Sequence, residues 1–212
     1  MELSKFLAPF RALLEFLVSI YRRAATYVRI SGSGAIMRRY FATNAFDGAM
    51  TTLGILLGVY LVGYARPEVV VGVVMSTSLA LFISGVFSVY VVESAERKRA
   101  LEELEAAVML DLDDTLIGEA DRFVSLFTAL IDGLAPLLVS LISISPFILS
   151  SQLSLDPRQA ALFSIGTVFL ILFLLGSYLG VGSIKRRALS GLKMLAAGIV
   201  ASICSVVLKA FG

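Results

Sequence analysis

Two aspartates, Asp47 and Asp132, lie inside long apolar runs, and each is followed directly by glycine. Because a carboxylate is costly to place in hydrocarbon, such residues usually serve ion or proton pathways. Met50 shares a helical face with Asp47, so its thioether could lie beside that carboxylate. Pro136 follows Asp132 by four residues and has no backbone N–H, which leaves the carbonyl oxygen of Asp132 without its helical donor. Together these groups could coordinate a cation.

A second set of acidic residues lies between the second and third apolar runs, where residues 93–122 hold ten carboxylates. Glu93, Glu96 and Glu103 fall on one helical stripe of this segment. Carboxylate oxygens with an occasional methionine sulfur suit Mn²⁺, Fe²⁺, Mg²⁺ or Ca²⁺ better than Zn²⁺ or Cu⁺. The chain has no histidine, which excludes a histidine metal site and a histidine general base. A solvated helical hairpin with ion pairs one turn apart is the alternative interpretation of the segment.

The elements that must position these residues are apolar helices. Of the 212 residues, 58% are hydrophobic and only 16% are charged, and the mean hydropathy is +0.91. Soluble domains carry about 25% charged residues, so this composition indicates a membrane protein. A spanning helix needs about 20 consecutive apolar residues. Five runs meet this requirement, at residues 44–64, 68–92, 123–150, 158–184 and 188–211. The predicted fold class is therefore an all-α membrane protein with five transmembrane helices.

Four segments make up the predicted organisation. Residues 1–39 combine an apolar and a basic helical face, which favours an amphipathic helix in the cytoplasmic interface or packed on the protein. Residues 40–92 hold transmembrane helices 1 and 2. Residues 93–122 form a short acidic cytoplasmic connector: a helix continuing the second span, a turn at "DLDD" and a second helix. Residues 123–212 hold transmembrane helices 3–5.

Lysines and arginines near the ends of the spans predict the orientation. Fourteen of them collect on the side of the amino-terminal segment and three on the other side. Because cytoplasmic loops carry the excess of basic residues, the amino terminus is predicted to be cytoplasmic and the carboxyl terminus external or lumenal. The chain is then a multi-pass integral membrane protein, in the plasma membrane if its source is prokaryotic.

Four phrases, in this order, resemble the vacuolar iron transporter family over about residues 40–211: "FATNAFDGAMTTLGILLGV", "SGVFSVYVVESAE", "DGLAPLL" and "SYLGVGSIKRRALSGLKMLAAGIVAS". The resemblance implies a five-span homodimer that exports Fe²⁺ or Mn²⁺ from the cytoplasm in exchange for protons. It implies no enzymatic activity, no permanent cofactor and no nucleic-acid partner, with membrane lipid as the surroundings. Asp47 and Glu93 match the family's first-span aspartate and second-span glutamate. Glu96 and Glu103 lie where its metal-binding acids are expected.

The chain departs from the family at three points. Val89 replaces a methionine, the connector is too short for the family's three-helix metal domain, and Asp132 lies outside the family's pattern. A metal-binding sensor or structural protein without transport is therefore the alternative function. A lipid head-group transferase of the CDP-alcohol type is disfavoured, because no aspartate follows Asp47 until Asp111 and that chemistry needs several at short spacing.

Overall fold

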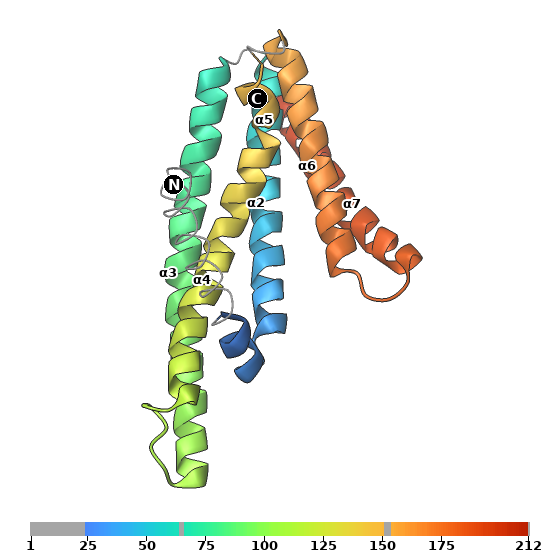
Figure 1. Ribbon diagram of the computed structural model, residues 1–212. Helices are drawn as coiled ribbons and strands as arrows, with labels where there is room; N and C mark the ends of the chain where they lie inside the picture. Colours follow the sequence, from blue (N-terminus) through green and yellow to red (C-terminus); the bar gives the residue numbers. More distant parts are fainter. Residues whose placement is uncertain (1–23, 64–65, 151–153, 212) are drawn as a thin grey trace, which may run out of the picture. The chain divides into compact units, whose positions relative to one another are not determined.

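A computed structural model describes residues 24–63, 66–150 and 154–211 (Figure 1). All regular elements in these ranges are helices. They are a short stretch at 24–30 and the helices α2 (Gly34–Val62), α3 (Pro67–Val108), α4 (Leu116–Ser143), α5 (Ser145–Ile148), α6 (Pro157–Leu179) and α7 (Ile184–Phe211). Most of the predicted amphipathic helix falls on residues 1–23, outside the described residues.

Five of these helices, α2, α3, α4, α6 and α7, are long and apolar enough to cross a membrane. The prediction of an all-helical protein with five potential spans is confirmed for the described part of the chain. Helix α3 continues beyond its apolar run to Val108, and α4 begins at Leu116 after a turn.

Two helix boundaries differ from the apolar runs. Helix α2 begins at Gly34, within the segment assigned to the amino-terminal helix, because Gly32 ends the preceding helical stretch with a φ of +64°. Such a left-handed conformation suits glycine, which lacks a Cβ. The third run is divided into α4 and the short α5, with Pro146 in the first turn of α5. Proline has no backbone N–H to donate to the carbonyl oxygen of Ile142, which instead accepts a hydrogen bond from the Oγ of Ser145.

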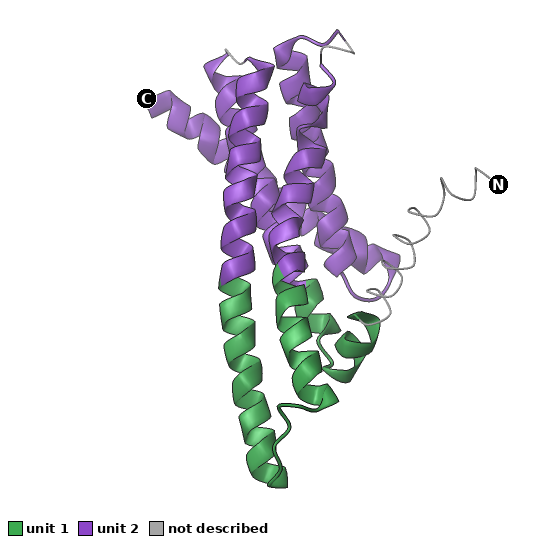
Figure 2. Ribbon diagram, turned by 60° about the vertical axis from the view of Figure 1, so that its left-hand side comes forward, with its two compact units in different colours: residues 1–38, 88–129 green, residues 39–87, 130–212 purple. Residues whose placement is uncertain are grey.

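The chain divides into two compact units (Figure 2). Unit 1 comprises residues 1–38 and 88–129, and unit 2 comprises residues 39–87 and 130–212. The boundaries fall inside α2, α3 and α4. Asp47, Met50 and Asp132 belong to unit 2, whereas Glu93, Glu96 and Glu103 belong to unit 1, so each group is described within its own unit.

The core of unit 2 is built from small, branched and aromatic apolar side chains of its helices, including Leu53, Val74 and Phe147. Helices α6 and α7 pack closely because glycines face each other across their contact. A Cβ at Gly176 would lie 2.6 Å from the carbonyl oxygen of Ser190, and one at Gly191 would lie 2.6 Å from that of Phe173. Small residues allow helix backbones to approach in this way.

Candidate functional site

Asp132 is the buried carboxylate of unit 2. It lies within α4 with only 2% of its surface exposed. The Nδ2 of Asn44 in α2 donates a hydrogen bond to its Oδ2. The same Nδ2 donates to the backbone carbonyl oxygen of Asp132, at 3.3 Å. This is the carbonyl that Pro136 leaves without a helical donor. The expected free oxygen is therefore satisfied by an uncharged side chain of another helix.

Asn44 belongs to a ladder of contacts between α2 and α4. Four residues after Asn44, a Cβ at Gly48 would lie 2.6 Å from the Cα of Pro136. Four residues further on, Thr52 and Ser140 share a hydrogen bond of 2.9 Å between their buried hydroxyls. Each pair is separated by the same interval in the sequence, so the two helices run parallel here and stay in register over two turns. Sequence reasoning missed this ladder, because it requires the pairing of distant helices.

The glycines of the two Asp-Gly pairs have a packing role. Gly48, after Asp47, allows α2 to approach Pro136. Gly133, after Asp132, allows α4 to approach α3, since a Cβ there would lie 2.7 Å from the carbonyl oxygen of Phe82. On the facing side, a Cβ at Gly85 would lie 2.8 Å from the Oδ2 of Asp132. The carboxylate of Asp132 is therefore enclosed by the backbone of α3 at Gly85 and by the side chain of Asn44 from α2.

Asp47 lies three residues after Asn44 on α2 and is exposed in the isolated chain. It therefore lies within one helical turn of Asn44, the residue of α2 that contacts Asp132. Met50 is half-buried and packs against the apolar core of unit 2. The structure therefore brings Asp47 and Asp132 into one region, while a ligand role for Met50 stays a prediction.

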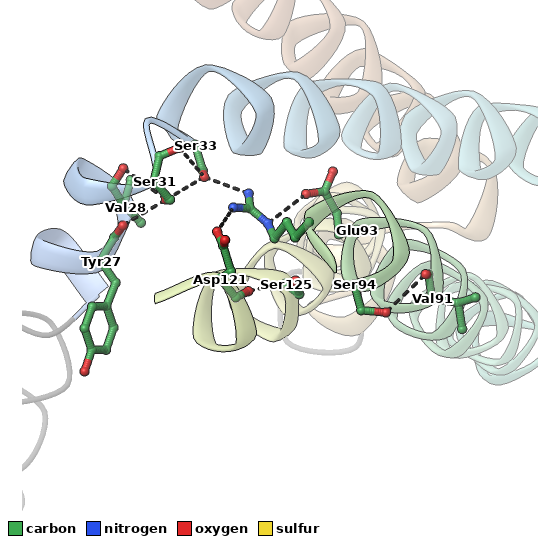
Figure 3. A network of polar contacts seen from close by, with 10 residues as sticks. Tyr27, Val28, Ser31, Ser33, Val91, Glu93, Ser94, Asp121 and Ser125 are labelled. Carbon is green, nitrogen blue, oxygen red and sulfur yellow. Dashed lines mark hydrogen bonds and ion pairs between the residues drawn. The ribbon is translucent and has the colours of Figure 1, made fainter. Parts of the chain in front are cut away.

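Glu93 occupies a different environment, in a buried polar network of unit 1 (Figure 3). The centre of the network is Arg97, one helical turn later. Its Nε lies 3.3 Å from the Glu93 carboxylate, and its two terminal nitrogens lie 2.8 Å from the Oδ1 of Asp121 and 2.7 Å from the Oγ of Ser33. Glu93 is 7% exposed. Two buried or half-buried carboxylates thus share one guanidinium.

The ion pair with Arg97 bears on the predicted role of Glu93 as a metal ligand. The Nε of Arg97 has no hydrogen bond among the described residues, so its contact with Glu93 is an ion pair without ideal hydrogen-bond geometry. A metal ion at Glu93 would have to displace or share with this guanidinium. The signal in the sequence was the spacing of Glu93 and Arg97 by four residues, which places oppositely charged side chains together on a helix.

The outer acids of the connector are solvated. Glu96 and Glu103 are exposed, and Glu96 pairs with Arg99 at 3.3 Å. Lys98 lies 3.9 Å from Glu102, with both side chains more than half exposed. In the residues that the structure describes, no three or more Cys, Asp or Glu side chains form a group suited to hold a metal ion. The role of Glu96 and Glu103 in metal capture stays a prediction.

Comparison with known proteins adds one similar sequence. The chain is 27% identical over 177 residues to an uncharacterized protein of Methanocaldococcus jannaschii, covering 82% of this chain and 89% of that protein. No model of a known protein family matches the chain. No solved structure matches it.

Proposed function

We propose that this protein is a proton-coupled transporter that exports Fe²⁺, Mn²⁺ or both from the cytoplasm. The observation that carries the proposal is the buried carboxylate of Asp132, which lies in a helix long and apolar enough to span a membrane and is held by an uncharged amide. Carboxylates in such positions are typical of ion and proton pathways.

The charge balance at Asp132 supports an exchange of cations. Among the described residues, no lysine or arginine forms an ion pair with Asp132. Asn44 satisfies hydrogen bonds but supplies no positive charge. An ionised carboxylate in an apolar interior needs a compensating cation. A proton and a divalent metal ion could each fill this role and would exclude each other, which is the requirement for coupling one flux to the other.

The nearby donors favour divalent iron or manganese. Asp47 adds a second carboxylate, and Met50 on the same face of α2 adds a soft thioether. Oxygen ligands dominate this set, and it contains neither imidazole nor thiolate, which suits Fe²⁺ and Mn²⁺ better than Zn²⁺ or Cu⁺. The resemblance to the vacuolar iron transporters at "NAFDGAMTTLG" supports the same assignment.

The remaining parts of the proposal follow from the sequence. The acids of residues 93–122, including Glu93, Glu96 and Glu103, would attract metal on the cytoplasmic side, and the amino terminus would lie on that side. A homodimer is supported by Gly54 and Gly58 of α2, where a Cβ would meet no described atom within 4 Å. A glycine pair with this spacing leaves room for a second helix at close approach.

The test is metal flux into or out of proteoliposomes across an imposed pH gradient, with Fe²⁺, Mn²⁺, Zn²⁺ and Ca²⁺ in competition. Asp132→Asn is expected to abolish the flux driven by the gradient, because an amide can neither bind a proton nor balance a cation. Asp156→Asn is the matched control, since this residue caps α6 and asparagine caps helices equally well. Full flux through Asp132→Asn, or loss of flux in both variants, would contradict the proposal.

A metal-binding sensor without transport is the second candidate. The favouring observation is the ion pair of Glu93 with Arg97, which leaves this carboxylate less available as a step on a transport path. Metal binding by the reconstituted protein without measurable flux would support the sensor.

A further inference from the structure

Unit 1 contains a cavity of about 320 Å³ between the later part of α3 and the beginning of α4. Small-ligand sites typically measure about 300–1,000 Å³, so this volume suits a compact polar group. The walls include Ser94, Asp121 and Ser125, which Figure 3 shows around the arginine network. The cavity does not include Asp47 or Asp132, the two carboxylates of unit 2 on which the proposed transport depends.

Two basic side chains, one from each helix, line this cavity, and neither forms a strong ion pair. Lys98 of α3 reaches only Glu102, at 3.9 Å and largely exposed to solvent, where an ion pair contributes little. Arg122 of α4 donates one N–H to the backbone carbonyl of Asp113 at 2.7 Å. Arg97, by contrast, is already paired with two carboxylates. Lys98 and Arg122 can therefore supply a net positive charge to a ligand.

The position of the cavity along α3 indicates whether its ligand comes from the membrane or from solution. Tyr90, at 45% exposure, lines the cavity within the last turn of the apolar run, next to the exposed Val91 and Val92. Lys98 follows Tyr90 by eight residues, a rise of about 12 Å along the helix. Tyrosine is enriched at membrane interfaces, and basic pockets just beyond the apolar region bind lipid head groups. The cavity thus begins where the hydrocarbon would end.

The two acidic residues of the cavity wall limit which ligands the cavity can bind. Asp121 is neutralised by Arg97 at 2.8 Å. Asp113, on the loop before α4, is exposed and can accept hydrogen bonds from a hydroxyl group. A bare phosphate could contact Lys98 and Arg122, but the negative charge of Asp113 would repel it. A phosphodiester that carries a hydroxylated group would place its phosphate at the cations and its hydroxyls at the carboxylate.

We propose that this cavity binds the head group of an anionic phospholipid of the phosphatidylglycerol type, with the phosphate between Lys98 and Arg122. The acyl chains then extend along the exposed apolar surface beside Tyr90. This site is independent of the proposed transport activity, and each proposal can fail without the other.

The experiment is a titration of the purified full-length protein in detergent with phosphatidylglycerol, with the lipid-bound fraction measured by native mass spectrometry. A basic residue at an anionic membrane surface contributes about fivefold in affinity, on the order of 1 kcal/mol. The Lys98→Gln/Arg122→Gln variant is therefore expected to bind roughly 30-fold more weakly, by the same rule for two residues. The charge-conserving Lys98→Arg/Arg122→Lys variant is expected to retain most of the binding.

The matched control is Lys185→Gln/Arg186→Gln, which removes two exposed basic residues at the start of α7. Equal losses in the control and the cavity variant, or no loss in the cavity variant, would overturn the proposal. Glycerol phosphate without acyl chains, and inorganic phosphate, form the soluble arms of the titration. Displacement of the lipid by either at comparable concentration would overturn the lipid assignment in favour of a soluble phosphate ligand. If the double variant does not fold, Lys98→Gln and Arg122→Gln are measured singly, each with an expected loss of about fivefold.

Discussion

Replacing Gly48 by alanine tests the close approach of α2 and α4 that positions Asn44 opposite Asp132. The new Cβ would lie 2.6 Å from the Cα and 2.7 Å from the Cβ of Pro136. Ordinary contacts between carbon atoms are about 3.5–4.0 Å, so the two backbones would have to separate. Neither the backbone nor the proline ring can rotate away. The close contacts between α2 and α4 would therefore be strained in this variant.

The magnitude follows from two opposing terms. Overpacking a close contact costs about 1–3 kcal/mol, and we take the upper half because the obstructing atoms are rigid. Alanine in a helix is more favourable than glycine by about 1 kcal/mol. The Gly48→Ala variant is thus expected to lose about 1–2 kcal/mol of stability, the difference between these terms.

Gly72→Ala provides the matched control, because a Cβ at Gly72 in α3 meets no described atom within 4 Å. This variant is expected to gain up to about 1 kcal/mol from helix propensity alone. The assay is unfolding of both variants in mixed detergent micelles, followed by circular dichroism. Equal stability of the two variants would refute the close packing of α2 against Pro136.

Three further predictions concern the polar contacts and the subunit interface. Arg97→Gln leaves the buried Glu93 without its counter-charge and is expected to cost about 3 kcal/mol, measured as a fall in thermal stability that Arg97→Lys partly avoids. Asn44→Ala removes both hydrogen bonds to Asp132 and is expected to cost about 1–3 kcal/mol; unchanged stability would show that the amide is not needed. Gly58→Ala is expected to shift the proposed dimer toward monomer in light scattering, without loss of helix content by circular dichroism.

The coarse architecture was predictable because it depends on local properties of the sequence. Long apolar runs predict spanning helices wherever they occur, and the charged helix after Val92 continues α3 because nothing in its sequence interrupts the helical pattern. The freed carbonyl of Asp132 was also predictable, since Pro136 determines it within one turn. These inferences need no knowledge of which helices are neighbours.

The partners of the carboxylates were not predictable in the same way. Asn44 meets Asp132 only because α2 and α4 pack in parallel with a constant register, which is a tertiary property. Arg97 is one of the fourteen basic residues that predict the cytoplasmic side, and its spacing of four residues from Glu93 allows the ion pair that the structure shows. The division of the third apolar run near Pro146 was not predicted, because hydropathy alone does not show that proline lacks the N–H for a helical hydrogen bond.

The role of Asp132 is tested most directly when metal and proton movement are measured together. Proteoliposomes containing the wild-type protein, Asp132→Asn or the Asp156→Asn control are loaded with a pH-sensitive dye, and Mn²⁺ is added on one side. If Asp132 couples the two fluxes, wild type and control move Mn²⁺ with opposing proton flux, and Asp132→Asn moves neither. Mn²⁺ flux in Asp132→Asn accompanied by the same proton flux as wild type would contradict this role of Asp132.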